Sequence, residues 1–166
     1  MSKIILMHTK NFIRDIKENE AIIYKVSGVY SNTIEDQKDL YQEIVYQLWK
    51  SYKSFKGESK ISTWIYRIAL NTSISYLKKE KRKSNQIIID SILSNRIEQI
   101  DTIMEDRIAL LYEHIKKLSI IEKGIILLHL DGKNYDEIAS ITGFSKTNIG
   151  TRLSRIKLKL KSQLIK

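Results

Sequence analysis

Residues 145–163 carry the side chains whose types and spacing best fit a specific chemistry. Ile149, Leu153 and Ile156 recur every three or four positions and would share one face of a helix. Short polar side chains and one long cation fall on the opposite face, namely Thr147, Asn148, Thr151, Ser154 and Arg155. Such groups can bond to base edges and phosphates in a DNA major groove. The pattern predicts a DNA-recognition helix; the alternative is an amphipathic helix whose polar face meets only water.

The residues before this helix fit the first half of a helix-turn-helix. Residues 135–142 can form a short helix, Gly143 can adopt the positive φ of a tight turn, and Ser145 can cap the next helix. Gly150 lies inside the predicted recognition helix, where glycine costs about 1 kcal/mol relative to alanine. Either DNA approaches the backbone closely at Gly150, or the lower helix stability that glycine causes there is tolerated without a function. Cations suited to phosphate contacts follow at Lys157, Lys159 and Lys161.

A basic and polar stripe is predicted on a helix over residues 60–82. Five of its side chains lie within about 80° of each other around the helix. They are Arg67, Asn71, Ser75, Lys78 and Arg82. The helix follows a loop that contains Lys56, Gly57 and Lys60, and Ser59 or Ser62 can cap it. Together with nearby rings, such groups could hold a single DNA strand. The rings are Phe55, Trp64 and Tyr66, and Trp64 is predicted to belong mainly to the core.

An acidic face is predicted on the helix over residues 36–54. Asp36, Asp39 and Glu43 lie at positions i, i+3 and i+7, and the apolar residues Leu40 and Ile44 lie on another face. An acidic face in a basic protein is unsuited to DNA and suits a basic protein partner. The alternative is an ordinary solvated surface.

The net charge of +10 is unevenly distributed over the 166 residues. Residues 50–83 hold ten basic and two acidic side chains, and residues 145–166 hold seven basic and no acidic ones. The remaining residues carry more acidic than basic side chains. Two separate basic zones fit two contact points on one polyanion, whereas the alternative is that lysines only keep the protein in solution.

The elements that must position these residues are all helices, because apolar residues recur at helical spacing and proline is absent. The predicted helices span residues 9–29, 36–54, 60–82, 105–118, 120–131, 135–142 and 146–163. The expected fold is all-α, with an N-terminal helical domain over 1–83, a linker over 84–104 and a C-terminal helix-turn-helix domain over 105–166. The apolar residues 87–89 are unusual for a linker and are expected to touch another part of the molecule.

The sequence offers no catalytic constellation. His8, His114 and His129 lack ligand spacing, the six glycines are scattered, and cysteine is absent. The pair Asp36 and Asp39 lacks the third acid that a nuclease metal site would need. We therefore expect no enzyme, no cofactor, no metal and no small-molecule substrate. No apolar run approaches the length of a membrane span, so we expect no membrane insertion. The absence of cysteine suits a reducing compartment, so we expect a cytoplasmic location.

Two motifs together resemble a bacterial RNA polymerase sigma factor of the extracytoplasmic-function (ECF) group of the sigma-70 family. Residues 36–43 (DQKDLYQE), 55–59 (FKGES), 63–69 (TWIYRIA) and then Asn71 match the region-2 pattern. Residues 133–160 resemble region 4. The resemblance covers about residues 10–83 and 105–163, and the two motifs follow in the family's order.

The resemblance implies a role for each group of residues. An acidic helix would dock on the clamp coiled coil of core RNA polymerase through Asp36, Asp39, Gln42 and Glu43. Region 2 would capture the melted non-template strand of the −10 promoter element, with a flipped base, through Lys56, Ser59, Lys60, Arg67, Asn71 and Lys78. Region 4 would read the −35 element as duplex through Thr147, Asn148, Thr151, Arg152, Ser154 and Arg155. Its apolar side would dock on the polymerase flap, the linker would run near the polymerase channel, and an anti-sigma factor is a further partner that the family allows.

Two other classes of protein remain as alternatives. A stand-alone helix-turn-helix regulator would bind duplex DNA as a dimer without polymerase, and would leave the N-terminal basic stripe unexplained. A protein-binding module, such as a polymerase-associated inhibitor, would use the acidic face and leave the recognition helix unexplained.

Overall fold

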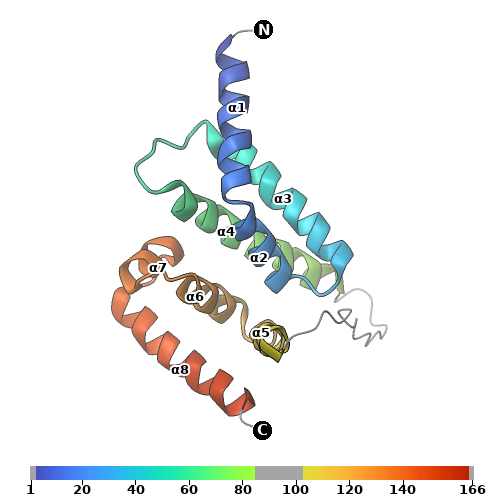
Figure 1. The fold of residues 1–166 in the computed structure, drawn as a ribbon, viewed down its shortest axis with the longest axis vertical. Coiled ribbons are helices and arrows are strands. Elements are labelled where there is room, and N and C mark those ends of the chain that lie inside the picture. Colours follow the sequence, from blue (N-terminus) through green and yellow to red (C-terminus); the bar gives the residue numbers. More distant parts are fainter. Residues whose placement is uncertain (1–2, 85–102, 165–166) are drawn as a thin grey trace. The chain divides into compact units, whose positions relative to one another are not determined.

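The computed structural model describes residues 3–84 and 103–164, and within this part of the chain every regular element is a helix (Figure 1). The eight described helices are α1 (Lys3–Glu18), α2 (Glu20–Tyr30), α3 (Ile34–Tyr52), α4 (Ile61–Ser84), α5 (Ile103–Lys116), α6 (Ile120–Leu130), α7 (Tyr135–Thr142) and α8 (Lys146–Leu164). The predicted all-α fold is confirmed. Residues 87–89, predicted to contact another part of the molecule, lie outside the described residues. No described helix is long and apolar enough to cross a membrane.

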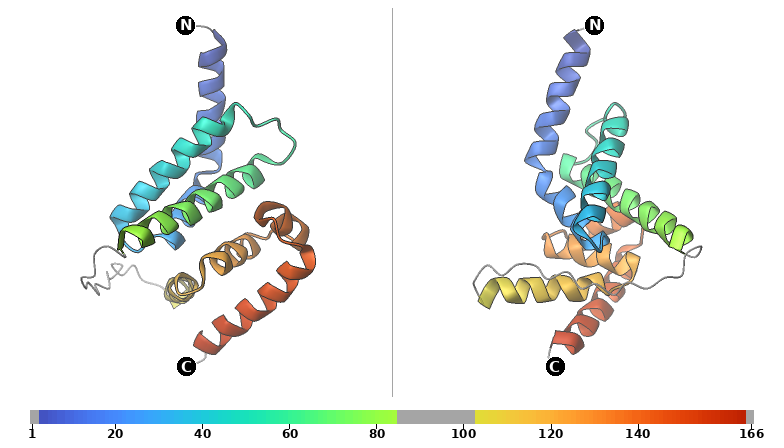
Figure 2. Two further views of the ribbon diagram at one scale, coloured as in Figure 1. Left: turned by 180° about the vertical axis from the view of Figure 1, so that it is seen from behind. Right: turned by 90° about the vertical axis from the view of Figure 1, so that its right-hand side faces the viewer.

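The chain divides into two compact units, Met1–Ile74 and Ser75–Lys166, and the division falls within α4. Each unit has its own buried apolar residues. Figure 2 shows the helices of both units from two further sides.

The prediction of one helix over residues 9–29 is wrong, because the structure has two helices that meet at Asn19. The side-chain amide of Asn19 donates a hydrogen bond to the backbone oxygen of Asp15 at 2.8 Å. The backbone N–H of Asn19 bonds instead to Ile16, at 3.1 Å, in a tighter turn. A local side-chain bond of this kind competes with the regular helix ladder, and here it ends α1.

The first unit is held together by apolar faces of α2, α3 and α4. Ile23 and Val26 of α2, Leu40 and Ile44 of α3, and Ile65 of α4 are all fully buried. The α1 helix adds a ring cluster against the end of α3. Its members are His8, Phe12, Trp49 and Tyr52, with ring centroids 4.9–6.0 Å apart. The Tyr52 hydroxyl also donates to Asp15 at 2.5 Å, which ties α1 to α3. Burial and this hydrogen bond raise the pKa of Tyr52 to about 12.

The second unit packs α5, α6, α7 and α8 around one apolar core. Its fully buried side chains include Ile115, Ile125, Leu128, Ile138 and Ile149. Capping boxes begin α6 and α7: Ser119 and Asn134 accept the N3 backbone N–H of their helices, and Glu122 and Glu137 accept in return. These caps fix where α6 and α7 start, and so set the approach to the turn before α8.

Candidate nucleic-acid interface

The predicted helix-turn-helix is formed by α7 and α8, and its turn has the geometry that the sequence predicts. Gly143 ends α7 with φ of +79°, in the left-handed region that favours glycine. Ser145 then accepts a hydrogen bond from the backbone N–H of Asn148 at 3.2 Å, and so caps α8. Ile149, Leu153 and Ile156 are completely buried, which turns the opposite face of α8 outward.

The structure brings the six predicted recognition residues together on α8. Five of them are exposed, and Arg152 is half-buried. Two of the hydroxyl groups bond to the helix itself: Thr151 donates to the backbone oxygen of Thr147, and Ser154 donates to that of Gly150, both at 3.1 Å. A shallow hollow runs along this side of the helix. It is lined by Glu122, Ser145, Thr147, Asn148, Thr151, Arg152 and Arg155.

Arg152 is held in one orientation by two neighbours. Its Nε donates to the side-chain oxygen of Asn148 at 2.5 Å, and its guanidinium carbon lies 4.7 Å from the centre of the Phe144 ring. The Asn148 contact has the i, i+4 spacing of helix neighbours, whereas the contribution of Phe144 was not predicted from the sequence. Arg155 is exposed on the same helix, so the two arginines differ in how firmly they are positioned.

An ion pair joins α8 to the start of α6. Lys159, predicted to contact phosphate, donates to Glu122 at 2.6 Å. Burial alone would raise the pKa of Glu122, but hydrogen bonds from Lys159 and Ser119 outweigh burial and lower it. Glu122 therefore caps α6 and orients α8 at once. The sequence did not predict this pair because its members are 37 positions apart. A second exposed pair, Lys146 with Asp136 at 2.8 Å, links α8 to α7.

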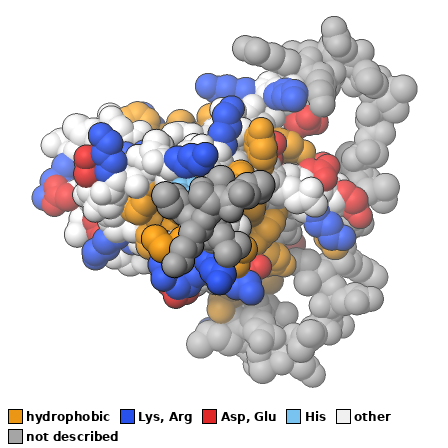
Figure 3. Space-filling view, turned by 90° about the horizontal axis from the view of Figure 1, so that it is seen from above, with side chains coloured by type: hydrophobic (Ala, Val, Ile, Leu, Met, Phe, Trp, Pro, Cys, Tyr) orange, Lys and Arg blue, Asp and Glu red, His pale blue; other side chains and the backbone are white. Residues whose placement is uncertain are grey.

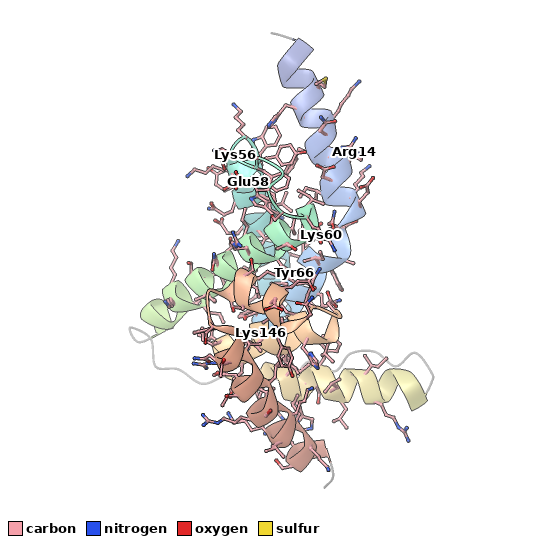
Figure 4. The ribbon with its side chains drawn as sticks, turned by 90° about the vertical axis from the view of Figure 1, so that its left-hand side faces the viewer. Arg14, Lys56, Glu58, Lys60, Tyr66 and Lys146 are labelled. Atoms are coloured by element: carbon pink, nitrogen blue, oxygen red, sulfur yellow. The ribbon has the colours of Figure 1, made fainter. Side chains whose placement is uncertain are left out.

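The predicted strand-capture residues lie on the loop before α4 and along α4 itself. Gly57 has φ of +73°, and Lys56, Ser59 and Lys60 are exposed on the loop (Figure 4). Arg67, Asn71, Ser75 and Lys78 follow as an exposed line along α4, while the side chain of Arg82 lies outside the described part. Both predicted caps of α4 are wrong. The helix begins at Ile61, so Lys60 occupies the N-cap position, one residue after Ser59, and Ser62 lies inside the first turn. Figure 3 shows Lys and Arg side chains spread among apolar ones on the face seen from above.

The expected role of Tyr66 as a stacking ring is wrong. Only 1% of Tyr66 is exposed, because it lies on the inward side of α4 with Ile65 and Ala69. Its hydroxyl has no hydrogen-bond partner among the described residues. Trp64 is half-buried and packs on Phe55, with ring centroids 5.0 Å apart. The rings near the loop are therefore Phe55 and Trp64.

The predicted acidic face lies on α3. Thr33 caps this helix by accepting the backbone N–H of Asp36 at 3.0 Å. Asp39 and Gln42 are exposed, Asp36 and Glu43 are half-buried, and Glu43 accepts a hydrogen bond from Gln47 at 2.8 Å. Next to the acidic face is an apolar hollow that the sequence did not predict. It is lined by Phe12, Tyr41, Gln42, Val45, Tyr46 and Trp49. Among the described residues, no group of three or more His, Cys, Asp or Glu side chains could hold a metal ion.

The comparisons with known proteins agree with this geometry. The family models for Sigma-70 region 2 and Sigma-70 region 4 match residues 16–83 and 108–160. The ECF RNA polymerase sigma-E factor of Escherichia coli (strain K12) is 29% identical over 147 residues, covering 80% of this chain and 75% of the relative. The sigma-E factor of Haemophilus influenzae is 27% identical over 154 residues, covering 84% and 82%.

Two solved structures share the fold. One is the sigma factor RpoE in complex with the anti-sigma factor NepR from Bartonella quintana, with a TM-score of 0.75, 22% identity, and 93% of this chain and 97% of that chain covered. The other is CnrH in complex with the cytosolic domain of CnrY, with a TM-score of 0.67, 16% identity, and 94% and 88% covered.

The two helical units and the two matched regions define the class of protein, a DNA-binding transcription factor of the sigma-70 type. The chain belongs to the sigma-70 family of RNA polymerase sigma factors, and within it to the extracytoplasmic-function group.

Proposed function

We propose that this sigma factor directs core RNA polymerase to promoters by reading the −35 element as duplex DNA and the −10 element as a melted strand. The observation that carries the proposal is the exposed polar face of α8, which lies behind a glycine turn and a serine cap on a fully buried apolar stripe. This is the arrangement in which a helix-turn-helix places side chains at base edges. The duplex-reading residues would be Thr147, Asn148, Thr151, Arg152, Ser154 and Arg155.

The −10 strand would be captured by the loop before α4 and by the exposed line along α4. Lys56, Lys60 and Arg67 offer cations for phosphates, and Ser59 and Asn71 offer hydrogen bonds for base edges. Lys78 extends the basic line along the same helix. Local melting followed by capture is physically reasonable, because unstacking a base costs a few kcal/mol and binding of the extruded base offsets that cost. The partly exposed rings of Phe55 and Trp64 support stacking close to the loop.

Polymerase would be bound through Asp36, Asp39, Gln42 and Glu43 on α3, facing a basic surface of the clamp coiled coil. The apolar hollow beside these residues supports the assignment, because protein interfaces combine an apolar centre with a polar rim. The apolar side of the C-terminal unit would dock on the polymerase flap. An anti-sigma factor is a further proposed partner, since one of the two solved structures is a complex of a sigma factor with an anti-sigma factor.

The proposed domain limits are 1–83, 84–104 and 105–166. They are supported by the end of α4 at Ser84, by the start of α5 at Ile103, and by the family-model matches at 16–83 and 108–160. The chain would act as a non-enzymatic initiation factor without cofactor or small-molecule substrate.

Electrophoretic band shifts with and without core polymerase test this function. The purified chain should shift promoter DNA only when core enzyme is present, and the complex should open the DNA around the −10 element. A regulator acting alone would shift its DNA unaided as a dimer, and that result would contradict the proposal.

The polymerase contact has a separate test in a charge-reversed variant. Asp39→Lys combined with Glu43→Lys should weaken capture of core enzyme in a pull-down without changing DNA sequence preference, because it places cations against a basic partner. The control Glu18→Lys with Glu113→Lys makes the same change in net charge at exposed sites on other helices, α1 and α5. Undiminished capture by the first variant, or equal loss in both, would reject the assigned face.

A further inference from the structure

The first half of α8 carries only small side chains at the centre of its exposed face. By helix geometry, Thr147, Thr151 and Ser154 project away from the buried stripe, and all three are exposed. The longer cations Arg152 and Arg155 lie to one side of this line. The part of the helix that would face the floor of a major groove therefore presents methyl and hydroxyl groups rather than guanidinium groups.

The hydroxyl hydrogens on this line are already used within the helix. Thr151 Oγ1 donates to the backbone oxygen of Thr147, and Ser154 Oγ donates to that of Gly150, each at 3.1 Å. While these bonds hold, the hydroxyl oxygens act towards DNA as acceptors, and the γ-methyl of Thr151 is left as its outer apolar group. Thymine offers a C5-methyl in the major groove and adenine offers an amino donor, whereas a G·C pair offers the amino donor of cytosine but no methyl group. Methyl groups and acceptors together match an A·T pair.

Gly150 next to Thr151 lets a partner come close to the helix backbone. A Cβ built at Gly150 would meet only the Tyr135 ring, at 3.5 Å, which is an ordinary contact, and Gly150 is not among the positive-φ glycines. Neither packing nor backbone conformation therefore requires glycine here, although glycine is unfavourable inside a helix. The missing side chain at this flank, beside Tyr135, leaves room for DNA on the α7 side of Thr151, and a short threonine needs close approach to reach a base edge.

We propose that Thr151 is a specificity-determining residue whose γ-methyl packs against the C5-methyl of a thymine in the duplex element bound by α8. Its oxygen then faces the amino group of an adenine in the same groove. The flanking cations hold phosphates and contribute affinity that is independent of sequence. This inference rests on the proposed function, because it requires α8 to read duplex DNA.

The test couples removal of one methyl on the protein to removal of one methyl on the DNA. Holoenzyme, assembled from the full chain and its cognate core polymerase, first selects duplexes from a promoter library randomised over the upstream element. Each thymine of the enriched element is then replaced singly by deoxyuridine, which lacks the C5-methyl. At one position this replacement should weaken binding about fourfold, as expected for loss of one buried methyl contact.

Variants at the same residue separate the methyl from the hydroxyl. Thr151→Ser removes the γ-methyl and should abolish the deoxyuridine penalty at that position. Thr151→Val keeps a methyl in the same shape and should retain the penalty. The control Ser162→Ala, at an exposed position further along α8, should also retain it. A penalty that persists in Thr151→Ser, or no penalty in the wild type, overturns this inference and leaves the proposed function intact. Failure to enrich any upstream element overturns the proposed function and the inference together.

Discussion

Replacing Gly150 with alanine should stabilise the C-terminal unit while weakening its binding to duplex DNA. Gly150 lies in the interior of α8, and the added methyl would sit 3.5 Å from the Tyr135 ring without a clash. Alanine is favoured over glycine in a helix interior by about 1 kcal/mol, so the free energy of unfolding should rise by about that amount. The same methyl would fill the flank between Tyr135 and the exposed line of α8 and would obstruct DNA that enters there, so promoter binding by the holoenzyme should fall severalfold.

The two tryptophans allow the stability change to be assigned to one unit. Trp49 and Trp64 both lie within Met1–Ile74, so their fluorescence reports on the first unit during urea unfolding. Circular dichroism at 222 nm reports on the helices of both units. Gly150→Ala should leave the fluorescence midpoint unchanged and raise the midpoint of the remaining helical transition by roughly 0.5–1 M urea.

The matched control is the same chemical change at Gly143. This glycine has φ of +79°, where a Cβ is disfavoured by about 1–2 kcal/mol, so Gly143→Ala should destabilise the second unit. Opposite signs at two glycines seven positions apart would support the distinction between them. If Gly150→Ala were destabilising, or stabilising with undiminished promoter binding, the argument for a close approach at Gly150 would be refuted.

Three further predictions follow from the described contacts. Tyr66→Phe removes a buried hydroxyl that has no partner among the described residues. It should raise the free energy of unfolding of the first unit by about 1 kcal/mol, measured by tryptophan fluorescence in urea. A lower free energy of unfolding would contradict this. The pKa of Glu122 is lowered on folding, so its charged form stabilises the second unit above pH 4.5, and this stability is lost as the pH falls through the lower folded pKa. Glu122→Gln should therefore make the free energy of unfolding of the second unit, followed by circular dichroism, depend less on pH in acid. An unchanged pH dependence would argue against the ion pair. Asn71→Ala with Lys78→Ala should slow promoter opening more than initial binding, seen as lower permanganate reactivity of melted thymines, and equal loss of both would reject strand capture.

Local sequence signals predicted the parts of the fold that depend on neighbouring residues. The turn at Gly143, the cap at Ser145 and the buried stripe of α8 follow from residue type and helical spacing, and the structure confirms them. The break at Asn19 was missed because the surrounding apolar spacing continues across it. The helix ends there through one hydrogen bond, from the Asn19 side chain to the backbone oxygen of Asp15.

Features that depend on distant parts of the chain could not be predicted in this way. The pair of Glu122 and Lys159 requires α6 and α8 to be adjacent, which helical periodicity does not reveal. Tyr66 lies beside Ile65, at the edge of the predicted apolar face. Its burial therefore depends on which neighbours cover that side of α4. The apolar hollow at Trp49 likewise requires α1 to lie against α3, as the ring contact between Phe12 and Trp49 shows.

Run-off transcription with purified core polymerase and fragments of the source genome tests the central claim most directly. The account predicts that adding the wild-type chain produces discrete transcripts that core enzyme alone does not make, starting downstream of paired −35 and −10 elements. Identical transcript patterns with and without the chain would contradict it.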